Sequence, residues 1–243
     1  MLIKACLNGS RHPDEHHALP LSPQQLASEA LDCQRAGAGA VHIHPRGMGG
    51  RETLEPDACA AAIEAIRDKC PQLPVGLTTG LWIMGNSERR LGAIEQWTVL
   101  PDFCSVNFSE DGTNELCALL LGKRIGIEAG LSSVADARAL IDSGFVGRCL
   151  RVLIEVEPGT KDPVKGAAAI GRVLEGAGVR LPTLQHGMGE QAWPLLEDAL
   201  ARGYDVRIGL EDTLTLPNGS VANGNAELVA AAVRLASRTV ARP

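Results

Sequence analysis

The amino-acid sequence predicts an α/β protein that folds as one (β/α)₈ barrel, a TIM barrel, over residues 1–243. Short apolar segments alternate eight times with longer segments rich in Ala, Leu and charged residues. The length of 243 residues is close to the roughly 250 residues of a typical barrel, and no linker-like stretch divides the chain. Aromatic residues make up only 3% of the sequence, so we expect a core built from Ala, Val, Leu and Ile.

The eight apolar segments are expected to be parallel strands. Residues 150–154 are almost continuously apolar, which is typical of a parallel strand covered by helices on one side and by the barrel interior on the other. The expected strands lie near residues 2–7, 38–44, 73–78, 102–107, 123–128, 148–155, 181–186 and 204–211.

A helix signal follows each expected strand. Ser22 is a good N-cap residue, Pro23 suits the first helical position, and Gln25 completes a capping box. The other seven helices are expected to begin near Glu55–Pro56, Asn86–Ser87, Thr113–Asn114, Ser133–Val134, Asp162–Pro163, Gly189–Glu190 and Asn223–Gly224. The alternative fold is an open doubly wound sheet, but the sequence has neither a G-x-G-x-x-G motif after the first strand nor a phosphate-binding P-loop.

Composition excludes several classes of partner. The net charge is −6 and there is no run of basic residues, which argues against nucleic acid and anionic membranes. There is no apolar run of spanning length, and the apolar start at residues 1–6 is too short for a signal peptide. The seven cysteines include no C-x-x-C pair, so we expect reduced, buried thiols in a cytoplasmic protein.

Two strand ends carry residues that suit a metal site. His42 and His44 lie two residues apart, so their side chains point to the same side of a strand. By the same alternation Arg207 and Glu211 share one side of the last strand, and a carboxylate facing the barrel interior needs a cation. Two imidazoles and one carboxylate leave an open coordination position, which is the catalytic arrangement for zinc. Asp212 is then a candidate proton acceptor, held by Arg207.

Other expected strand ends are also polar, and their convergence on one rim predicts an active site at the mouth of the barrel. Thr78 and Thr79 follow the third strand, Asn107 ends the fourth, and Glu128 lies at the end of the fifth. Any one of these residues alone would be a common cap or loop residue.

The segments His42–Arg46, Thr78–Gly80, Glu128–Gly130 and Arg207–Asp212 together resemble the β-keto acid cleavage enzyme family, over about residues 3–238. The resemblance implies a zinc-dependent barrel, usually a homotetramer, that converts a β-keto acid and acetyl-CoA into acetoacetate and a new acyl-CoA by acyl transfer and a retro-Claisen step. It implies zinc ligation by His42, His44 and Glu211, a general base at Asp212 with Arg207 as its partner, a substrate-binding hydroxyl at Thr78 or Thr79, and a role for Glu128 in acyl and CoA transfer.

Two positions depart from the family pattern. Arg11 falls near the position where the family member acting on an amino-bearing substrate has a glutamate, so we expect an acidic or neutral acyl group. The sequence stops at Pro243, where typical members continue, so the contacts of the expected homo-oligomer, a tetramer or dimer, should differ. The basic residues expected nearest to CoA are Arg46, Arg51, Arg89 and Arg90.

Three other functions are compatible with the same residues. A zinc-dependent aldolase would act without CoA, a metal-binding barrel would have no turnover, and an iron-dependent oxygenase would use the same two-histidine, one-carboxylate ligand set.

Overall fold

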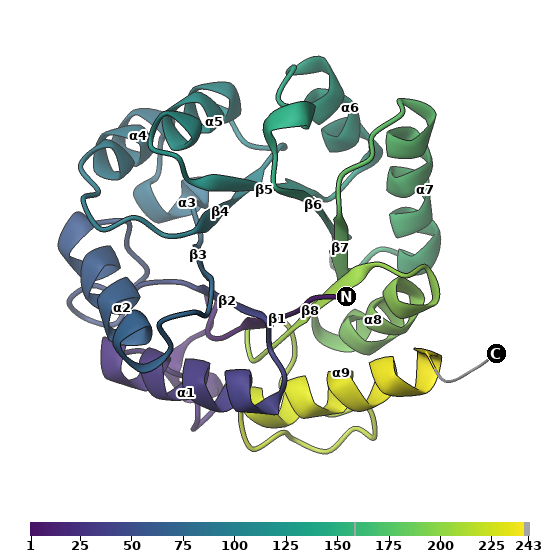
Figure 1. The fold of residues 1–243 in the computed structure, drawn as a ribbon, viewed down its shortest axis with the longest axis horizontal. Helices are drawn as coiled ribbons and strands as arrows, with labels where there is room; N and C mark the ends of the chain where they lie inside the picture. Colours follow the sequence, from purple (N-terminus) through teal and green to yellow (C-terminus); the bar gives the residue numbers. More distant parts are fainter. Residues whose placement is uncertain (158, 241–243) are drawn as a thin grey trace.

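The computed structural model describes residues 1–157 and 159–240. Eight parallel strands, β1 to β8, form a closed barrel in sequence order, and the helices surround it (Figure 1). The predicted (β/α)₈ fold is therefore confirmed. The strands are β1 Ile3–Cys6, β2 Ala40–Ile43, β3 Val75–Leu77, β4 Phe103–Asn107, β5 Gly126–Leu131, β6 Arg151–Glu155, β7 Thr183–His186 and β8 Asp205–Ile208.

The helices begin close to the predicted positions. Ser22 and Ser133 each form a capping box, and Asn86 and Asp162 cap α4 and α7. The predicted helix start at Gly189 is a 3₁₀ turn, and the α-helix begins three residues later. The helices are α1 Pro23–Ala36, α2 Pro56–Lys69, α3 Leu81–Met84, α4 Ser87–Glu95, α5 Thr113–Gly122, α6 Val134–Asp142, α7 Pro163–Gly176, α8 Ala192–Ala201 and α9 Asn225–Val240. No helix in the described ranges has both the length and the apolar character that a membrane crossing requires.

The fifth strand lies three residues later than predicted. Helix α5 runs to Gly122, and Arg124 then takes a left-handed conformation with φ of 62°, so residues 123–125 form the turn rather than the strand. As a consequence Glu128 lies in the middle of β5, where it pairs in register with Arg151, the first residue of β6.

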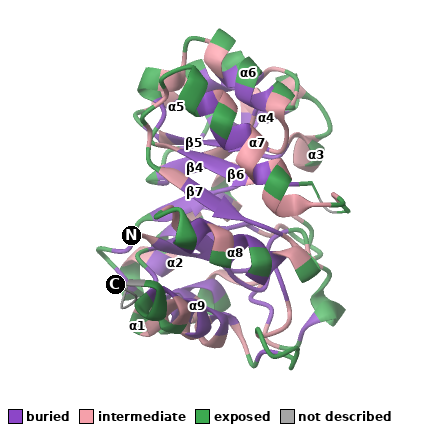
Figure 2. Cartoon of the chain, turned by 90° about the vertical axis from the view of Figure 1, so that its right-hand side faces the viewer, coloured by how far each residue is buried: buried purple, intermediate pink, exposed green. Residues whose placement is uncertain are grey.

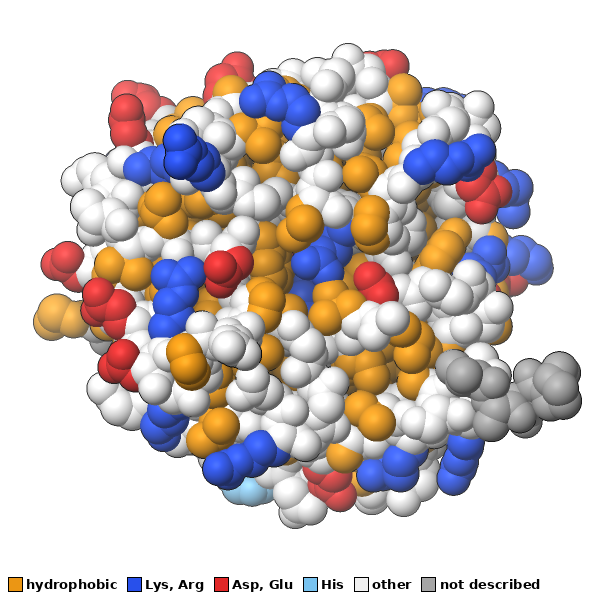
Figure 3. Space-filling model, viewed as in Figure 1, with side chains coloured by type: hydrophobic (Ala, Val, Ile, Leu, Met, Phe, Trp, Pro, Cys, Tyr) orange, Lys and Arg blue, Asp and Glu red, His pale blue; other side chains and the backbone are white. Residues whose placement is uncertain are grey.

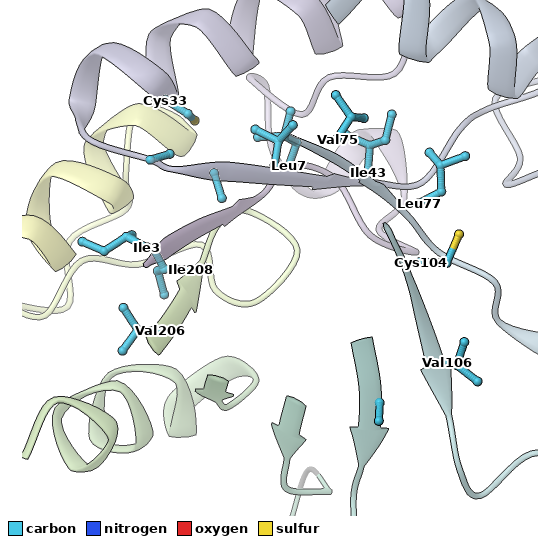
Figure 4. Packing of buried hydrophobic residues seen from close by; sticks show 14 of the residues in the cluster. Ile3, Leu7, Cys33, Ile43, Val75, Leu77, Cys104, Val106, Val206 and Ile208 are labelled. Atoms are coloured by element: carbon cyan, nitrogen blue, oxygen red, sulfur yellow. The ribbon is translucent and has the colours of Figure 1, made fainter. Parts of the chain in front are cut away.

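The main apolar core is a ring between the strands and the helices. Figure 2 shows the buried strands inside the more exposed helices, and Figure 4 shows strand side chains that belong to this cluster, such as Ile43, Val75, Val106 and Ile208. The apolar side chains are mostly aliphatic, as the composition predicts.

The inner side of the barrel also carries charged side chains. Lys4 and Glu128 form an ion pair across it with both side chains 0% exposed, and Arg151 Nε lies 3.3 Å from Glu128 Oε2. Both cations lie near the Phe103 ring, whose centroid is 5.7 Å from Lys4 Nζ and 5.2 Å from the Arg151 guanidinium carbon. Figure 3 shows the face on which the N-terminus lies, with basic side chains near its centre. The predicted site lies at the opposite face, where the strands end.

Candidate metal centre and active site

Strands β2 and β8 bring the three predicted metal ligands together. The Nε2 atoms of His42 and His44 are 3.1 Å apart, Glu211 Oε1 is 3.5 Å from His44 Nε2, and Glu211 Oε2 is 3.9 Å from His42 Nε2. All three side chains are buried, and they form a cluster of possible ligand atoms within 4.8 Å of one another. The two strands are not neighbours; both flank β1, so the cluster straddles the first strand of the barrel.

The unsatisfied atoms of this cluster fit a bound cation. Glu211 Oε2 is buried and has no hydrogen-bond partner in the described part of the chain. Burial lowers the pKa of His44, but the carboxylates of Glu211 and Glu52 outweigh burial and raise that pKa to about 9. The surroundings therefore favour the charged form of His44, whereas burial lowers the pKa of His42 well below its ordinary value. Two nitrogen donors and one carboxylate are a donor set that suits zinc with an open position.

Backbone geometry around the cluster fixes the ligands. The side chain of Asn8 clamps the backbone of His44, because Nδ2 donates to its carbonyl oxygen at 2.8 Å and Oδ1 accepts from its N–H at 2.9 Å. Gly9 has φ of 54°, and a Cβ at this position would lie 2.4 Å from Glu211 Cγ. A side chain at position 9 would therefore displace Glu211, one of the three candidate metal ligands.

Asp212 lies beside the cluster and is held by one of its two oxygens. Arg207 donates to Asp212 Oδ1 from Nε at 3.0 Å and from Nη2 at 2.7 Å, and the same Nη2 donates to Glu211 Oε1 at 2.7 Å. Burial opposes the charge on Arg207, but Asp212 and Glu211 keep its pKa well above the ordinary value. Asp212 Oδ2 is buried without a hydrogen-bond partner among the described residues, so this oxygen is left to accept a proton.

His186, at the end of β7, extends this group. Its Nδ1 is 3.3 Å from Asp212 Oδ1, and its Nε2 is 2.9 Å from Glu155 Oε2. Burial and Arg207 lower the pKa of His186, but the two carboxylates outweigh them and raise it. The polar ends of β6 and β7 are visible in the sequence, but their contact with Asp212 depends on the closed barrel.

The remaining rim residues have mixed positions. Thr78 Oγ1 accepts from the Gly80 N–H at 3.2 Å, whereas the Thr79 hydroxyl donates to the Ser105 carbonyl at 2.6 Å. Asn107 Nδ2 donates to Glu110 Oε1 at 2.9 Å. Glu128 is not at the rim; it lies inside the barrel in its ion pair with Lys4.

The predicted CoA contact at Arg90 is wrong, because its side chain is fully buried and pairs with Glu110.

A cavity of about 380 Å³ opens beside the metal cluster. It is lined by Ser10–Pro13, Arg46, Gly49–Glu52, Trp82 and Ile83. Arg11 lies at this cavity, where its Nε donates to the Leu210 carbonyl and its Nη1 pairs with Glu15 at 2.8 Å. The cavity adjoins the cluster directly, because Glu52 lines it and also lies 2.5 Å from His44 Nδ1. Sequence reasoning missed Glu52.

Comparison with known proteins identifies the family of this chain. A family model described as beta-keto acid cleavage enzyme matches residues 1–126 and 127–243. The chain belongs to the β-keto acid cleavage enzyme family. The family resemblance inferred from the four strand-end segments is thereby confirmed, and the chain is an enzyme.

Curated relatives in the β-keto acid cleavage enzyme family match along nearly the whole chain. The 3-keto-5-aminohexanoate cleavage enzyme of Fusobacterium nucleatum is 29% identical over 261 residues, covering 100% of this chain and 94% of that protein. The 3-oxoadipate:acetyl-CoA acetyltransferase of Cupriavidus necator is 25% identical, covering 94% of this chain and 85% of that protein. Among solved structures, ObcA in a ternary complex with a C4-CoA adduct and oxalate superimposes with a TM-score of 0.72 at 18% identity. That match covers 91% of this chain and 64% of the ObcA chain, and it supports the barrel fold.

Proposed function

We propose that this protein is a zinc-dependent β-keto acid cleavage enzyme, which combines a β-keto acid with acetyl-CoA and releases acetoacetate and a new acyl-CoA. The observation that carries the proposal is Asp212 Oδ2, which has no hydrogen-bond partner among the described residues and lies beside three convergent candidate metal ligands. The names of two relatives, a 3-oxoadipate:acetyl-CoA acetyltransferase and a 3-dehydrocarnitine:acetyl-CoA trimethylamine transferase, support acetyl-CoA as the co-substrate.

Each residue of the site has a separate role in the proposed reaction. His42, His44 and Glu211 would hold zinc, which supplies a Lewis acid for the keto oxygen when bound. Asp212 Oδ2 accepts a proton from the carbon between the keto and carboxylate groups, and Arg207 orients Asp212 through its two hydrogen bonds to Oδ1. Thr78, Thr79 and Asn107 lie on the neighbouring strand ends, where we propose that they orient the substrate carboxylate.

The proposed reaction takes place in two steps. The substrate carbanion attacks the acetyl carbonyl carbon, so a carbon–carbon bond forms and the CoA thiolate leaves. The thiolate then attacks the original keto carbon, the bond from that carbon to the former carbanion carbon breaks, and protonation gives acetoacetate. The acyl group of the β-keto acid remains as its CoA ester.

The cavity favours an acidic acyl group over an aminated one. Three arginines, Arg11, Arg46 and Arg51, line it together with one carboxylate, that of Glu52. This balance of charge attracts an anionic substituent and repels an ammonium group.

The experiment is a comparison of two substrates on zinc-loaded protein, with acetoacetate as the readout. We expect turnover of a β-keto dicarboxylate such as 3-oxoadipate and much weaker turnover of 3-keto-5-aminohexanoate. Equal or better turnover of the amino-bearing acid would overturn the substrate assignment. Turnover of a β-keto acid with acetyl-CoA absent would instead indicate an aldolase.

The metal assignment has its own variant. Glu211→Gln should lose both bound zinc and turnover, whereas Glu88→Gln, a change on an exposed face of α4, should keep both. A fully active, metal-free Glu211→Gln protein would contradict the proposal.

A further inference from the structure

The loop after β2 folds back onto the metal ligand that precedes it. Arg46 and Glu52 form an antiparallel bridge, and the Gly47 N–H donates to the Arg51 carbonyl at 2.8 Å. Gly49 and Gly50, with φ of 83° and 75°, provide the left-handed residues of the turn. This fold brings Glu52, eight residues after His44, next to the imidazole of that histidine.

Glu52 completes the hydrogen bonding of only one metal-binding imidazole. Its Oε1 lies 2.5 Å from His44 Nδ1, and its side chain is 13% exposed. Since His44 Nε2 points at His42 and Glu211, its Nδ1 carries the proton and donates to Glu52. By contrast, His42 Nδ1 has no hydrogen-bond partner in the described ranges. The position of the His44 ring therefore depends on Glu52 in a way that the His42 ring does not.

Trp82 holds the other oxygen of Glu52. Its Nε1 donates to Glu52 Oε2 at 3.2 Å, although the residue is 54% exposed. The indole also lies against Gly80: a Cβ at that position would be 2.3 to 2.5 Å from three carbons of the six-membered ring. The Trp82 indole is therefore held at two points, by its hydrogen bond to Glu52 and by its contact with Gly80.

We propose that Glu52 is a positioning residue for the metal centre: it fixes the His44 tautomer that presents Nε2 to the metal, and Trp82 fixes Glu52. The proposal rests on the metal centre of the proposed function but not on the acetyl-CoA reaction. Carboxylates in this position raise the basicity of a ligating imidazole and fix its ring orientation, and their loss typically weakens metal binding about 10- to 100-fold.

The test measures zinc affinity by competition with a chelator and the visible absorption of the cobalt-substituted protein, neither of which requires turnover. Glu52→Gln should weaken zinc binding about 10- to 100-fold and change the cobalt spectrum. Trp82→Phe should weaken binding by a smaller factor, because Glu52 keeps its contact with His44. Glu55→Gln is the matched control: Glu55 is exposed, makes no side-chain cap hydrogen bond, and should leave both readouts unchanged.

Thermal unfolding of the metal-free variants separates positioning from folding. Glu52→Gln should unfold at nearly the wild-type temperature when zinc is absent. Wild-type affinity and an unchanged cobalt spectrum in this variant would overturn the inference. If Glu52→Gln does not fold, wild-type values of both readouts in Trp82→Phe overturn it instead. A wild-type protein that binds no zinc would refute the proposed function itself, so the two failures are distinguishable.

Discussion

The ion pair between Lys4 and Glu128 inside the barrel gives the most quantitative prediction. Both side chains are 0% exposed, and Arg151 lies on the other carboxylate oxygen of Glu128 at 3.3 Å. We consider three proteins: Glu128→Gln, Lys4→Met, and the double variant. The first leaves the buried Lys4 and the partly buried Arg151 without their carboxylate, whereas the second leaves Glu128 with Arg151 as its partner.

The two single variants should lose different amounts of stability, because Glu128 has two cations beside it. Removing one partner of a buried ion pair typically costs about 3–5 kcal/mol, because the other charge stays buried and unpaired. We place Glu128→Gln in this range, which corresponds to a fall in melting temperature of roughly 6–20 °C for a chain of this size. Lys4→Met should cost less, because Arg151 remains beside the carboxylate. The double variant should be more stable than Glu128→Gln, because it no longer contains a buried Lys4 ammonium group without a carboxylate partner.

The assay is urea denaturation of all three variants and the wild type, completed as a double-mutant cycle. Loss of less than about 1 kcal/mol in Glu128→Gln would refute the reasoning, and so would a double variant no more stable than that single variant. Turnover of the double variant then addresses the role of Glu128 that the family resemblance implies. Recovery of stability without turnover would assign Glu128 to the reaction, and recovery of both would make its role structural.

Two further predictions concern the ends of the strands. Gly209→Ala should destabilise the protein by about 3 kcal/mol in urea denaturation, because the new Cβ would lie 2.0 Å from the Cys6 carbonyl oxygen. Gly92→Ala in α4, which meets no atom within 4 Å, should instead stabilise by about 0.5–1 kcal/mol; similar values for the two would contradict the close approach. The ion pair of Glu155 and His186 should stabilise the protein most between pH 4.5 and 6.5, which are the ordinary pKa values of the two groups. The difference in free energy of unfolding between the wild type and Glu155→Gln should therefore be largest in this pH range. Burial raises the pKa of Glu155, but His186 outweighs it and lowers the pKa to about 2, so this contribution is lost on acidification towards that pH. Because the pKa of His186 is raised, the contribution of His186 to stability is lost as the pH rises through this raised pKa. A difference in free energy of unfolding between wild type and Glu155→Gln that does not change with pH would contradict the pairing.

Much of the barrel and its metal cluster follows from periodicity. The alternation of segments predicts the eight strands, and a period of two places His42 with His44. Placing Glu211 beside them needs one more step, the closure of the barrel, which puts β2 and β8 on either side of β1. These are properties of strand geometry, so they depend little on the loops.

The features that the sequence did not predict depend on loops and on contacts across the barrel. The contact of Glu52 with His44 depends on how residues 45–53 fold back, and nothing in strand periodicity specifies that path. The start of β5 depends on where α5 ends. The end of α5 therefore determines whether Glu128 lies at the rim of the barrel or in its interior. The partner of Lys4 lies on the opposite side of the barrel, so its identity depends on the stagger of the strands rather than on any neighbouring residue.

The position of the proposed metal ligands on either side of β1 has a consequence for assembly of the fold. His42 and His44 come from the second strand, whereas Glu211 follows the last one, so the ligands bridge the seam where the two ends of the barrel meet. A nascent chain that ends before residue 211 carries two of the three ligands. If these residues bind a metal as proposed, tight binding requires that the last strand has docked, and the bound ion would then stabilise the closed barrel by mass action.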